Sequence, residues 1–528
     1  MTSEEINFSK IGVLGAGSMG AGLCLLLAEK NHCVFFHDPN DDNVRKLTGD
    51  ACNIGLQDRV ISCASTADVF RNINDGVRAA LYLMSVPHGA VADTVLEALR
   101  PHLRPADVII DCGNEHYADT ERRQKALAVD GVLYVGCGVS GGYQSARRGP
   151  SMSAGGDEAD AVAARLLPFL QELAARDDRG RPCTAVVGPG GSGHYVKMIH
   201  NGIEQGMMGI LAEVWLIMSS PRGSLRMSNV DIADTLALWN RAGELRGCFL
   251  VGIGAEVLRA RRREGSGGGQ HVLSAIRDKV VQDADGSEGT GAWTCAEAVA
   301  AHIPAATILA AHLYRCASAS ATLREAVSAA TADNNDDDDD ASDRVQEIPS
   351  ADRQDFLAAL HAATYFGFLS CFAEGLDVLR AKDRQAGWHL DYAEIVQLWR
   401  AGCIIRADGI LDTLASIFAG GGDGARLDQD VFARPEVTAA MHRRLPAVKR
   451  VVLAATAADL LLPALSQSFE HFKYMQATPH GPAQFIEAQL DYFGKHMFDT
   501  WDEPPGGAET GKHHFEWKPA RGTSDDPA

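Results

Sequence analysis

The first 190 residues alternate short apolar runs with longer helix-like stretches. The apolar runs have the length of buried strands, and the stretches between them have the spacing of helices. Alternation of this kind is typical of a doubly wound parallel sheet with helices on both faces. We therefore expect an α/β domain over residues 1–190. Its expected strands are Ile11–Leu14, Cys33–His37, Ala80–Met84, Val108–Asp111 and Leu133–Val135.

Beyond residue 190, strand-like runs become scarce and long segments rich in alanine and leucine take their place. This pattern predicts a large all-α domain over residues 191–475. Within it, residues 333–343 are expected to form a disordered acidic loop, because their carboxylates repel one another. The expected helices are Tyr195–Met218, Ile232–Ala242, Ala296–Ala319, Arg353–Ala381, Tyr392–Phe418 and Val448–Phe472.

Residues 476–528 are rich in proline, glycine and charge, which favours a C-terminal segment and tail over a further domain. In this tail His513, His514 and Trp517 are candidates for docking on a second subunit.

Composition narrows the class of protein. The 528 residues are 46% hydrophobic and 22% charged, which is typical of a globular protein, and the net charge of −20 disfavours nucleic-acid or anionic-membrane surfaces. The twelve cysteines form no CxxC pair or Cys/His ladder, so we expect reduced thiols and no metal site. The N-terminus lacks the pattern of a signal peptide, and a cytoplasmic protein is expected.

A glycine motif follows the first expected strand. Gly15-Ala16-Gly17-Ser18-Met19-Gly20 matches GxGxxG between an apolar strand and an apolar helix, which indicates a dinucleotide-binding loop in a Rossmann-like domain. Gly15 would permit the tight turn, Gly17 the approach of a pyrophosphate, and Gly20 the close packing of helix on strand. The first helical N–H groups would face the phosphates.

Asp38 ends the second expected strand, 18 residues after Gly20. A carboxylate there accepts hydrogen bonds from an adenosine ribose and repels a 2′-phosphate. The expected cofactor is NADP or NAD, and Asp38 favours NAD. The alternative is that Asp38-Pro39-Asn40 is only a turn.

The strongest chemical signal is a polar stripe. Lys197, His200, Asn201 and Glu204 lie at i, i+3, i+4 and i+7 after the glycine-rich segment Gly190–Gly193, so they share one helix face. The alternative is that this face of the helix is simply exposed to solvent. That alternative does not explain why His200 and Asn201 occur together after a glycine-rich segment. A lysine base needs its pKa lowered by burial or a nearby cation, and a glutamic acid that donates a proton needs its pKa raised.

The segment from Gly190 to Glu204 resembles the signature helix of the 6-phosphogluconate dehydrogenase family, which are decarboxylating enzymes of the β-hydroxyacid dehydrogenase superfamily. Other motifs that carry the resemblance span nearly the whole chain. They are Gly113-Asn114, Ser140-Gly141-Gly142 before Ala146-Arg147, Gly289-Thr290-Gly291 before Trp293-Thr294, the segment Trp399–Arg406, and Asp491–Gly494 before His496.

The resemblance implies oxidative decarboxylation of 6-phosphogluconate or a closely related aldonate to a ketopentose (phosphate) and CO2, with reduction of NAD(P), as in the pentose phosphate pathway. Lys197 would take the proton from the C3 hydroxyl, and Glu204 would protonate C1 of the enediol. Val86 and Asn114 would adjoin the cofactor. His496 would come from the other subunit of a homodimer. The implied substrate contacts are Asn114, Ser140, Gly141, Gly142, His200, Asn201, Gln205, Thr290, Arg315 and His496.

The chain departs from the family pattern at the end of the site that would bind the substrate's phosphate. Gln205 replaces a tyrosine, Glu288 a lysine and Leu490 an arginine. The distal end could therefore prefer a shorter, unphosphorylated or differently charged aldonate, unless a cation such as Lys473 or Lys495 replaces the missing ones.

Two further departures concern the cofactor and the entrance of the site. His37-Asp38-Pro39 replaces the Asn-Arg-Thr of NADP-dependent members, and Tyr143 replaces a glutamate. The rival interpretations are a non-decarboxylating β-hydroxyacid dehydrogenase and a catalytically silent NAD-binding paralogue.

Overall fold

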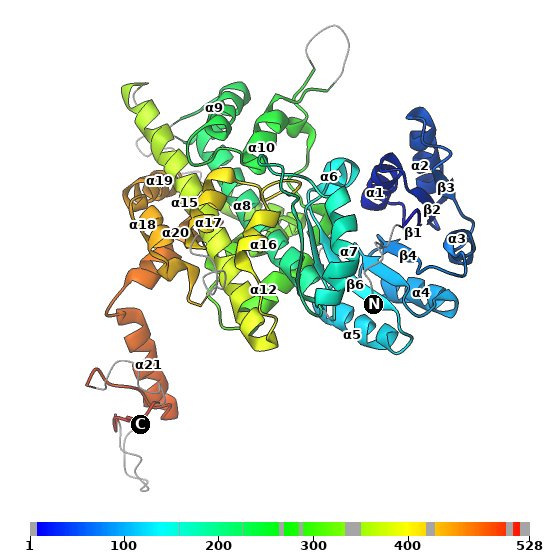
Figure 1. Ribbon diagram of the computed structural model, residues 1–528. Coiled ribbons are helices and arrows are strands. Elements are labelled where there is room, and N and C mark those ends of the chain that lie inside the picture. Colours follow the sequence, from blue (N-terminus) through cyan, green and yellow to red (C-terminus); the bar gives the residue numbers. More distant parts are fainter. Residues whose placement is uncertain are drawn as a thin grey trace. The chain divides into compact units, whose positions relative to one another are not determined.

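The computed structural model describes residues 8–157, 159–223, 225–262, 269–284, 289–332, 350–418, 428–502 and 511–517. The chain divides into two compact units, residues 1–469 and 470–528 (Figure 1). The expected sheet domain and most of the expected helical domain therefore belong to one unit. The expected acidic loop at 333–343 and Glu288 lie outside the described residues.

The first unit contains an eight-stranded sheet in the order β3-β2-β1-β4-β5-β6-β7-β8. Neighbouring strands are parallel except for β6 and β7, which are antiparallel, so the sheet is mixed rather than wholly parallel. The strands are β1 Lys10–Leu14, β2 Cys33–His37, β3 Val60–Ser62, β4 Leu81–Met84, β5 Val108–Asp111, β6 Leu133–Val139, β7 Met152–Gly155 and β8 Thr184–Gly188.

Both faces of the sheet are covered. Along β4, Leu81 and Leu83 pack into one hydrophobic cluster while Tyr82 and Met84 pack into another, because successive side chains of a strand point to opposite faces. The flanking helices are α1 Ser18–Glu29, α2 Asp41–Asn53, α3 Thr66–Ile73, α4 Ala90–Leu99, α5 Tyr117–Ala128, α6 Gly142–Arg148 and α7 Ala159–Leu173. The doubly wound arrangement expected from the sequence is confirmed.

Helices dominate the chain after β8, as expected, but three expected helices are each divided in two. Residues 296–319 contain parts of α12 and α13, with Pro304 just before α13, and residues 448–472 contain parts of α19 and α20, which begins at Pro463. The long helices are α8 Ser192–Ser219, α9 Asn229–Arg241, α10 Phe249–Arg259, α12 Thr290–Ala300, α13 Ala306–Ser318, α14 Ala321–Ala332, α15 Ser350–Ala386, α19 Leu445–Ala457 and α20 Pro463–Gln476.

The third division separates α16 from α17. Between them Gly402 adopts a left-handed backbone conformation with φ of +67°, which ends the helical run. The short helices are α11 Val281–Ala284, α16 Tyr392–Leu398, α17 Asp408–Ile417 and α18 Pro435–His442.

Helix α8 connects the sheet to the helices, because it packs on β6 and β7 and also on α12, α13 and α15. Over the described residues, α15 is the one helix long and apolar enough to cross a bilayer, and 83% of that stretch is buried inside the protein. Such extensive burial is typical of a helix in the core of a folded domain.

The second unit is built around α21 Gly481–Gly494. Asp491 on this helix is fully buried, and its carboxylate accepts hydrogen bonds from four N–H groups of the tail. The donors and distances are the amide of Met497 at 3.1 Å, Nδ1 of His514 at 2.9 Å, the amide of Phe515 at 3.1 Å and Nε1 of Trp517 at 2.8 Å. His514 and Trp517 therefore hold the tail to its own helix.

Candidate active site

The glycine loop between β1 and α1 has the geometry that dinucleotide binding requires. Gly15 has φ of +94°, and a Cβ there would lie 2.3 Å from the carbonyl oxygen of Ser85. A Cβ at Gly20 would lie 2.1 Å from the carbonyl oxygen of Gly15, whereas one at Gly17 would meet nothing within 4 Å. Gly17 thus faces open space at the N-terminus of α1, where no side chain caps the helix. A pyrophosphate fits this loop.

Asp38 ends β2 and holds the glycine loop. Its Oδ2 accepts a hydrogen bond from the amide of Ala16 at 2.6 Å, and its Oδ1 accepts from the amide of Asn40 at 2.8 Å and from Nδ2 of Asn43 at 3.2 Å. A carboxylate oxygen can accept two hydrogen bonds, so Oδ2 retains capacity for a ribose hydroxyl. The turn at residues 38–40 and the cofactor role of Asp38 are therefore compatible.

Val86 and Asn114 follow the ends of β4 and β5. A Cβ added at Gly15 would lie 3.0 Å from Cγ1 of Val86. A Cβ added at Gly113 would lie 3.0 Å from the carbonyl oxygen of Val86. Asn114 is exposed beside Gly113. The strand order reverses between β1 and β4, and open α/β sheets bind ligands at the carboxyl ends of strands beside such a reversal.

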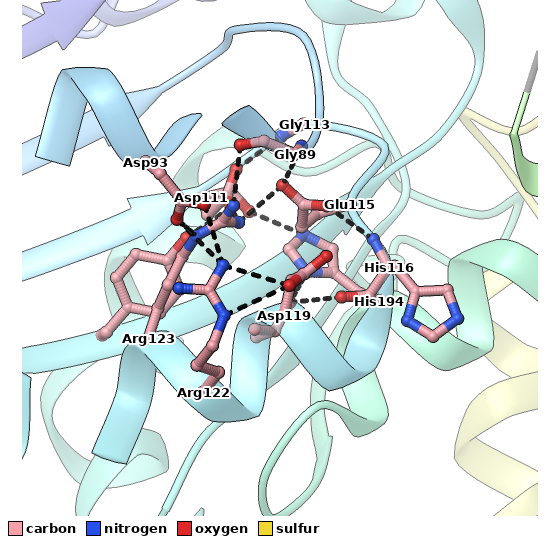
Figure 2. A network of polar contacts seen from close by, with 12 residues as sticks. Gly89, Asp93, Asp111, Gly113, Glu115, His116, Asp119, Arg122, Arg123 and His194 are labelled. Atoms are coloured by element: carbon pink, nitrogen blue, oxygen red, sulfur yellow. Dashed lines mark hydrogen bonds and ion pairs between the residues drawn. The ribbon is translucent and has the colours of Figure 1, made fainter. Parts of the chain in front are cut away.

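A buried ion-pair network supports the segment that carries Asn114 (Figure 2). Nη1 of Arg123 on α5 donates to Oε2 of Glu115 at 2.5 Å, its Nε donates to Asp93 at 2.8 Å, and its Nη2 donates to the carbonyl oxygen of Gly89 at 3.0 Å. Glu115 also accepts from the amide of Gly89 at 2.9 Å. The segments after β4 and β5 are thus tied to each other through α5.

The same network reaches the first turn of α8 through His194 (Figure 2). Burial lowers the pKa of His194, so its ring is neutral. Its Nε2 lies 3.1 Å from the carbonyl oxygen of Asp111 and its Nδ1 lies 2.7 Å from Oγ1 of Thr120. These partners fit a tautomer in which Nε2–H donates to Asp111 and Nδ1 accepts from Thr120. His194 therefore anchors α8 to the end of β5, one turn before Lys197.

Glycines allow α8 to lie directly against the sheet. A Cβ on Gly193 would lie 2.3 Å from the carbonyl oxygen of Gly136, and one on Gly138 would lie 2.3 Å from Cβ of Lys197. Oγ of Ser153 donates to the carbonyl oxygen of Gly193 at 2.9 Å. Larger residues at these positions would push the helix away, so the glycines place Lys197, which is only 7% exposed, against β6.

The polar stripe expected on α8 is present and largely buried. His200 is fully buried, and burial together with the charge of Lys197 holds its pKa well below the usual value. Its Nδ1 lies 3.0 Å from Oδ1 of Asn201 and 3.7 Å from Oε2 of Glu204. Nδ2 of Asn201 donates to Oγ1 of Thr290 on α12 at 3.0 Å. The stripe is therefore not a solvated face.

Lys197 and Glu204 lie seven residues apart on α8, on the same face of the helix as His200. Burial is the main reason that the pKa of the Cys403 thiol is raised, and the charges of Lys197 and Glu204 both act on that thiol with opposite signs. Oε2 of Glu204 lies 3.7 Å from Nδ1 of His200, which lies between the two residues on the same face of α8. An amine and a carboxyl group on one helix face are the kinds of group that can exchange protons with a bound molecule.

The loop Ser140–Gly142 packs against the segment that contains Gly402. Ser140 is buried, and a Cβ on Gly141 would lie 2.3 Å from the carbonyl oxygen of Gly402. The same oxygen accepts a hydrogen bond from the amide of Ser151 at 2.9 Å. Two segments far apart in sequence thus meet beside the α8 site, whereas Tyr143 is exposed.

The distal residues Gln205 and Arg315 are both engaged by protein groups. Oε1 of Gln205 lies 3.1 Å from Nδ1 of His312, and Nε of Arg315 donates to Oδ2 of Asp283 at 2.5 Å. Among the other residues expected here, Leu490, Lys473, Lys495 and His496 belong to the second unit. Their contribution to the site stays a prediction.

Family comparisons cover nearly the whole chain. Residues 10–188 match the model for the NAD binding domain of 6-phosphogluconate dehydrogenase, and residues 193–517 match the model for its C-terminal domain. This chain belongs to the 6-phosphogluconate dehydrogenase family.

Curated relatives and a solved structure agree with the family. A decarboxylating 6-phosphogluconate dehydrogenase of Emericella nidulans is 37% identical over 521 residues, which cover 95% of this chain and all of the relative. A chloroplastic decarboxylating 6-phosphogluconate dehydrogenase of Oryza sativa is 35% identical, and the match covers 96% of this chain and 93% of the relative. The 6-phosphogluconate dehydrogenase of Plasmodium falciparum, whose structures include complexes with NADP+ and with 6-phosphogluconate, is similar in fold with a TM-score of 0.81. It is 28% identical in sequence, and the match covers 96% of this chain and 100% of that chain.

Sequence reasoning missed three residues that shape the site: His194, Arg123 and His312. No local pattern distinguishes a buried Arg123 from a surface arginine, since its partners come from other elements. His194 lies within the segment from Gly190 to Glu204, but the residue pattern of that segment indicates no role for it. His312 precedes Cys316 by four residues on α13, which is a spacing that a helix places on one face.

Proposed function

We propose that this protein catalyses the oxidative decarboxylation of 6-phosphogluconate to a ketopentose phosphate and CO2, with reduction of a nicotinamide cofactor. The observation that carries the proposal is that buried Lys197 shares one face of α8 with Glu204, whose Oε2 lies 3.7 Å from Nδ1 of buried His200. Family membership supports the substrate class, and the glycine loop supports the cofactor class.

Lys197 and Glu204 divide the proton transfers between them. In its deprotonated form, Lys197 would take the proton of the C3 hydroxyl during the oxidation, and the resulting 3-keto acid would lose CO2. The Lys197 ammonium stabilises the enolate oxygen, and Glu204 protonates C1 of the enediol. The Gly15–Gly20 loop and Asp38 would hold the dinucleotide, and its nicotinamide ring would supply the hydride acceptor.

His200 is suited to orient the sugar acid. With Nδ1–H directed to Asn201, its Nε2 is an acceptor, and this buried atom has no hydrogen-bond partner among the residues that the structure describes. An unsatisfied buried acceptor is costly, so a substrate hydroxyl that donates to it would gain affinity. Ser140–Gly142 and Thr290 are proposed to contact the same substrate.

We propose NAD as the preferred cofactor. The segment 38–42 contains Asp38, Asp41 and Asp42 and lacks any lysine or arginine. Three carboxylates near the adenosine ribose would repel the 2′-phosphate of NADP, whereas the ribose hydroxyls of NAD can donate to Asp38.

A steady-state screen of 6-phosphogluconate and gluconate, each with NAD and with NADP, tests both proposals. We expect turnover of 6-phosphogluconate with one CO2 released per cofactor reduced, and kcat/KM at least about tenfold higher with NAD. Asp38→Asn should reduce that NAD preference roughly tenfold, the equivalent of about 1.4 kcal/mol. Asp58→Asn, at an exposed carboxylate beyond α2 and outside this segment, is the matched control and should leave the ratio unchanged.

Several results would contradict these proposals. Cofactor reduction without CO2 would indicate a non-decarboxylating dehydrogenase, and cofactor binding without turnover would indicate a silent paralogue. Faster turnover of gluconate would move the substrate to an unphosphorylated aldonate. An unchanged cofactor ratio in Asp38→Asn would refute the role of Asp38.

We also propose a homodimer in which the C-terminal segment docks on a second copy of this chain. Phe485 and Phe493 of α21 are 68% and 71% exposed, and together with Ile486, Tyr492 and Trp517 they line an apolar hollow. An apolar surface of this kind marks an interaction site. Sedimentation equilibrium should give twice the chain mass, and Phe485→Glu with Phe493→Glu should give the monomer mass. A monomeric wild type at micromolar concentration would refute the proposal.

A cytoplasmic location is proposed as well. All twelve cysteines are free thiols, which is typical of a reducing compartment.

A further inference from the structure

Three residues of different metal-binding types converge next to Gln205. Asp283 comes from α11, and His312 and Cys316 come from successive turns of α13. Sγ of Cys316 lies 3.6 Å from Nε2 of His312 and 3.9 Å from Oδ1 of Asp283. All three potential ligand atoms lie within 4.8 Å of one another.

These separations fit a tetrahedral zinc ion. Zinc–sulfur and zinc–nitrogen bonds of about 2.3 and 2.05 Å at a tetrahedral angle place the two ligand atoms about 3.6 Å apart. The distance of 3.6 Å between Sγ of Cys316 and Nε2 of His312 matches this value. The distance of 3.9 Å between Sγ of Cys316 and Oδ1 of Asp283 is a few tenths of an ångström longer than the roughly 3.6 Å expected between a sulfur and a carboxylate oxygen on one zinc ion. Little movement is needed to accept the ion.

The surroundings orient each ligand. The ring of His312 is buried and its Nδ1 lies 3.1 Å from Oε1 of Gln205, a partner that can only accept, so Nδ1 carries the proton and the Nε2 lone pair is directed toward Cys316. The other oxygen of Asp283 accepts from Nε of Arg315 at 2.5 Å, which holds the carboxylate in place. Outer partners of this kind are a regular feature of protein metal sites.

We propose that Asp283, His312 and Cys316 bind a divalent cation of the zinc type, with a fourth position open to water or a ligand oxygen. Thiolate and imidazole ligands favour Zn²⁺ over Mg²⁺ or Ca²⁺, which prefer oxygen alone. On binding, the Cys316 thiol releases its proton to solvent and a sulfur–metal bond forms. Because the ion adds two positive charges and the thiol loses one proton, the net charge of the site rises by one unit. This change occurs next to α8, the helix that carries Glu204. The site does not depend on the proposed reaction.

Metal titration of the full-length protein tests the site directly. After removal of metal with a chelator and reloading, we expect one Zn²⁺ per chain by elemental analysis. The Co²⁺-loaded protein should show a thiolate-to-cobalt charge-transfer band that is missing in Cys316→Ser. Because loss of an outer partner alone weakens metal binding 10–100-fold, His312→Gln should weaken Zn²⁺ binding by about 100-fold or more.

Two matched controls separate this site from adventitious binding. Cys52→Ser removes an exposed thiol, and His302→Asn removes an exposed histidine whose φ of +54° asparagine tolerates. Both should bind Zn²⁺ as the wild type does. Gln205→Leu should weaken binding about 10–100-fold without removing a ligand.

Substoichiometric Zn²⁺ in the wild type, or a Co²⁺ form without the charge-transfer band, would overturn the proposal whatever the variants do. Retention of wild-type affinity by Cys316→Ser or by His312→Gln would overturn it equally.

Discussion

Lys197→Met is expected to reduce kcat for 6-phosphogluconate by roughly 10⁴-fold, the upper range for loss of a general base. Methionine has nearly the length of lysine and no charge, so it fits the buried position against β6. The substitution removes both the base at the C3 hydroxyl and the cation that stabilises the enolate. Steady-state kinetics measure the loss, and fluorescence titration with NAD should show that cofactor affinity stays within about threefold.

Lys382→Met provides the control for this experiment. Lys382 is a partly buried lysine of α15 whose Nζ donates to the hydroxyl of Tyr117 at 2.8 Å and lies 6.0 Å from the ring centre of Tyr195, which is not part of the polar stripe. Its replacement should leave kcat within an order of magnitude of the wild type. If Lys197→Met keeps more than a tenth of wild-type kcat, Lys197 is not the base.

Glu204→Gln is expected to lower kcat by about 10²–10³-fold and to change the time course. Glutamine has the same shape but cannot protonate C1 of the enediol, so the step after CO2 loss becomes slow. Oxidation and decarboxylation still proceed once. We therefore expect a rapid burst of one reduced cofactor per site, followed by slow turnover, in a stopped-flow experiment.

Glu213→Gln is the matched variant on the same helix. Glu213 is buried on α8, where burial raises its pKa to about 7, and its carboxylate accepts hydrogen bonds from the amides of Ala464 and Leu465. This variant should lower the melting temperature through loss of these bonds and should produce no burst. A Glu204→Gln enzyme without a burst and with wild-type kcat would show that another group protonates C1.

Much of the catalytic helix could be predicted from sequence because its signal is local. Residues at i, i+3, i+4 and i+7 share a face in any α-helix, so Lys197, His200, Asn201 and Glu204 form a stripe once the helix exists. The spacing of Gly15, Gly17 and Gly20 is likewise local, because the turn and the helix start that require these glycines lie within six residues.

The fold was less predictable where elements are short or are ended by single residues. Strands β3, β7 and β8 were not expected; β3 has three residues, and β7 consists of Met152-Ser153-Ala154-Gly155, which lacks a clear apolar alternation. Apolar periodicity continues across Pro304 and across Pro463, so the sequence suggested one helix where the structure has two. The antiparallel pairing of β6 with β7 depends on partners that no single strand specifies.

The sequence alone determined which chemical groups share one helix face and which loop can approach a phosphate, since these depend on backbone geometry over a few residues. Tertiary structure decided whether those groups are buried and what holds them. Arg123 and His194 anchor the site through Glu115 and Asp111, and Asp283 meets His312 and Cys316, only because separate elements pack together. Burial and charge coupling arise from neighbours distant in the chain, so only the folded molecule sets them.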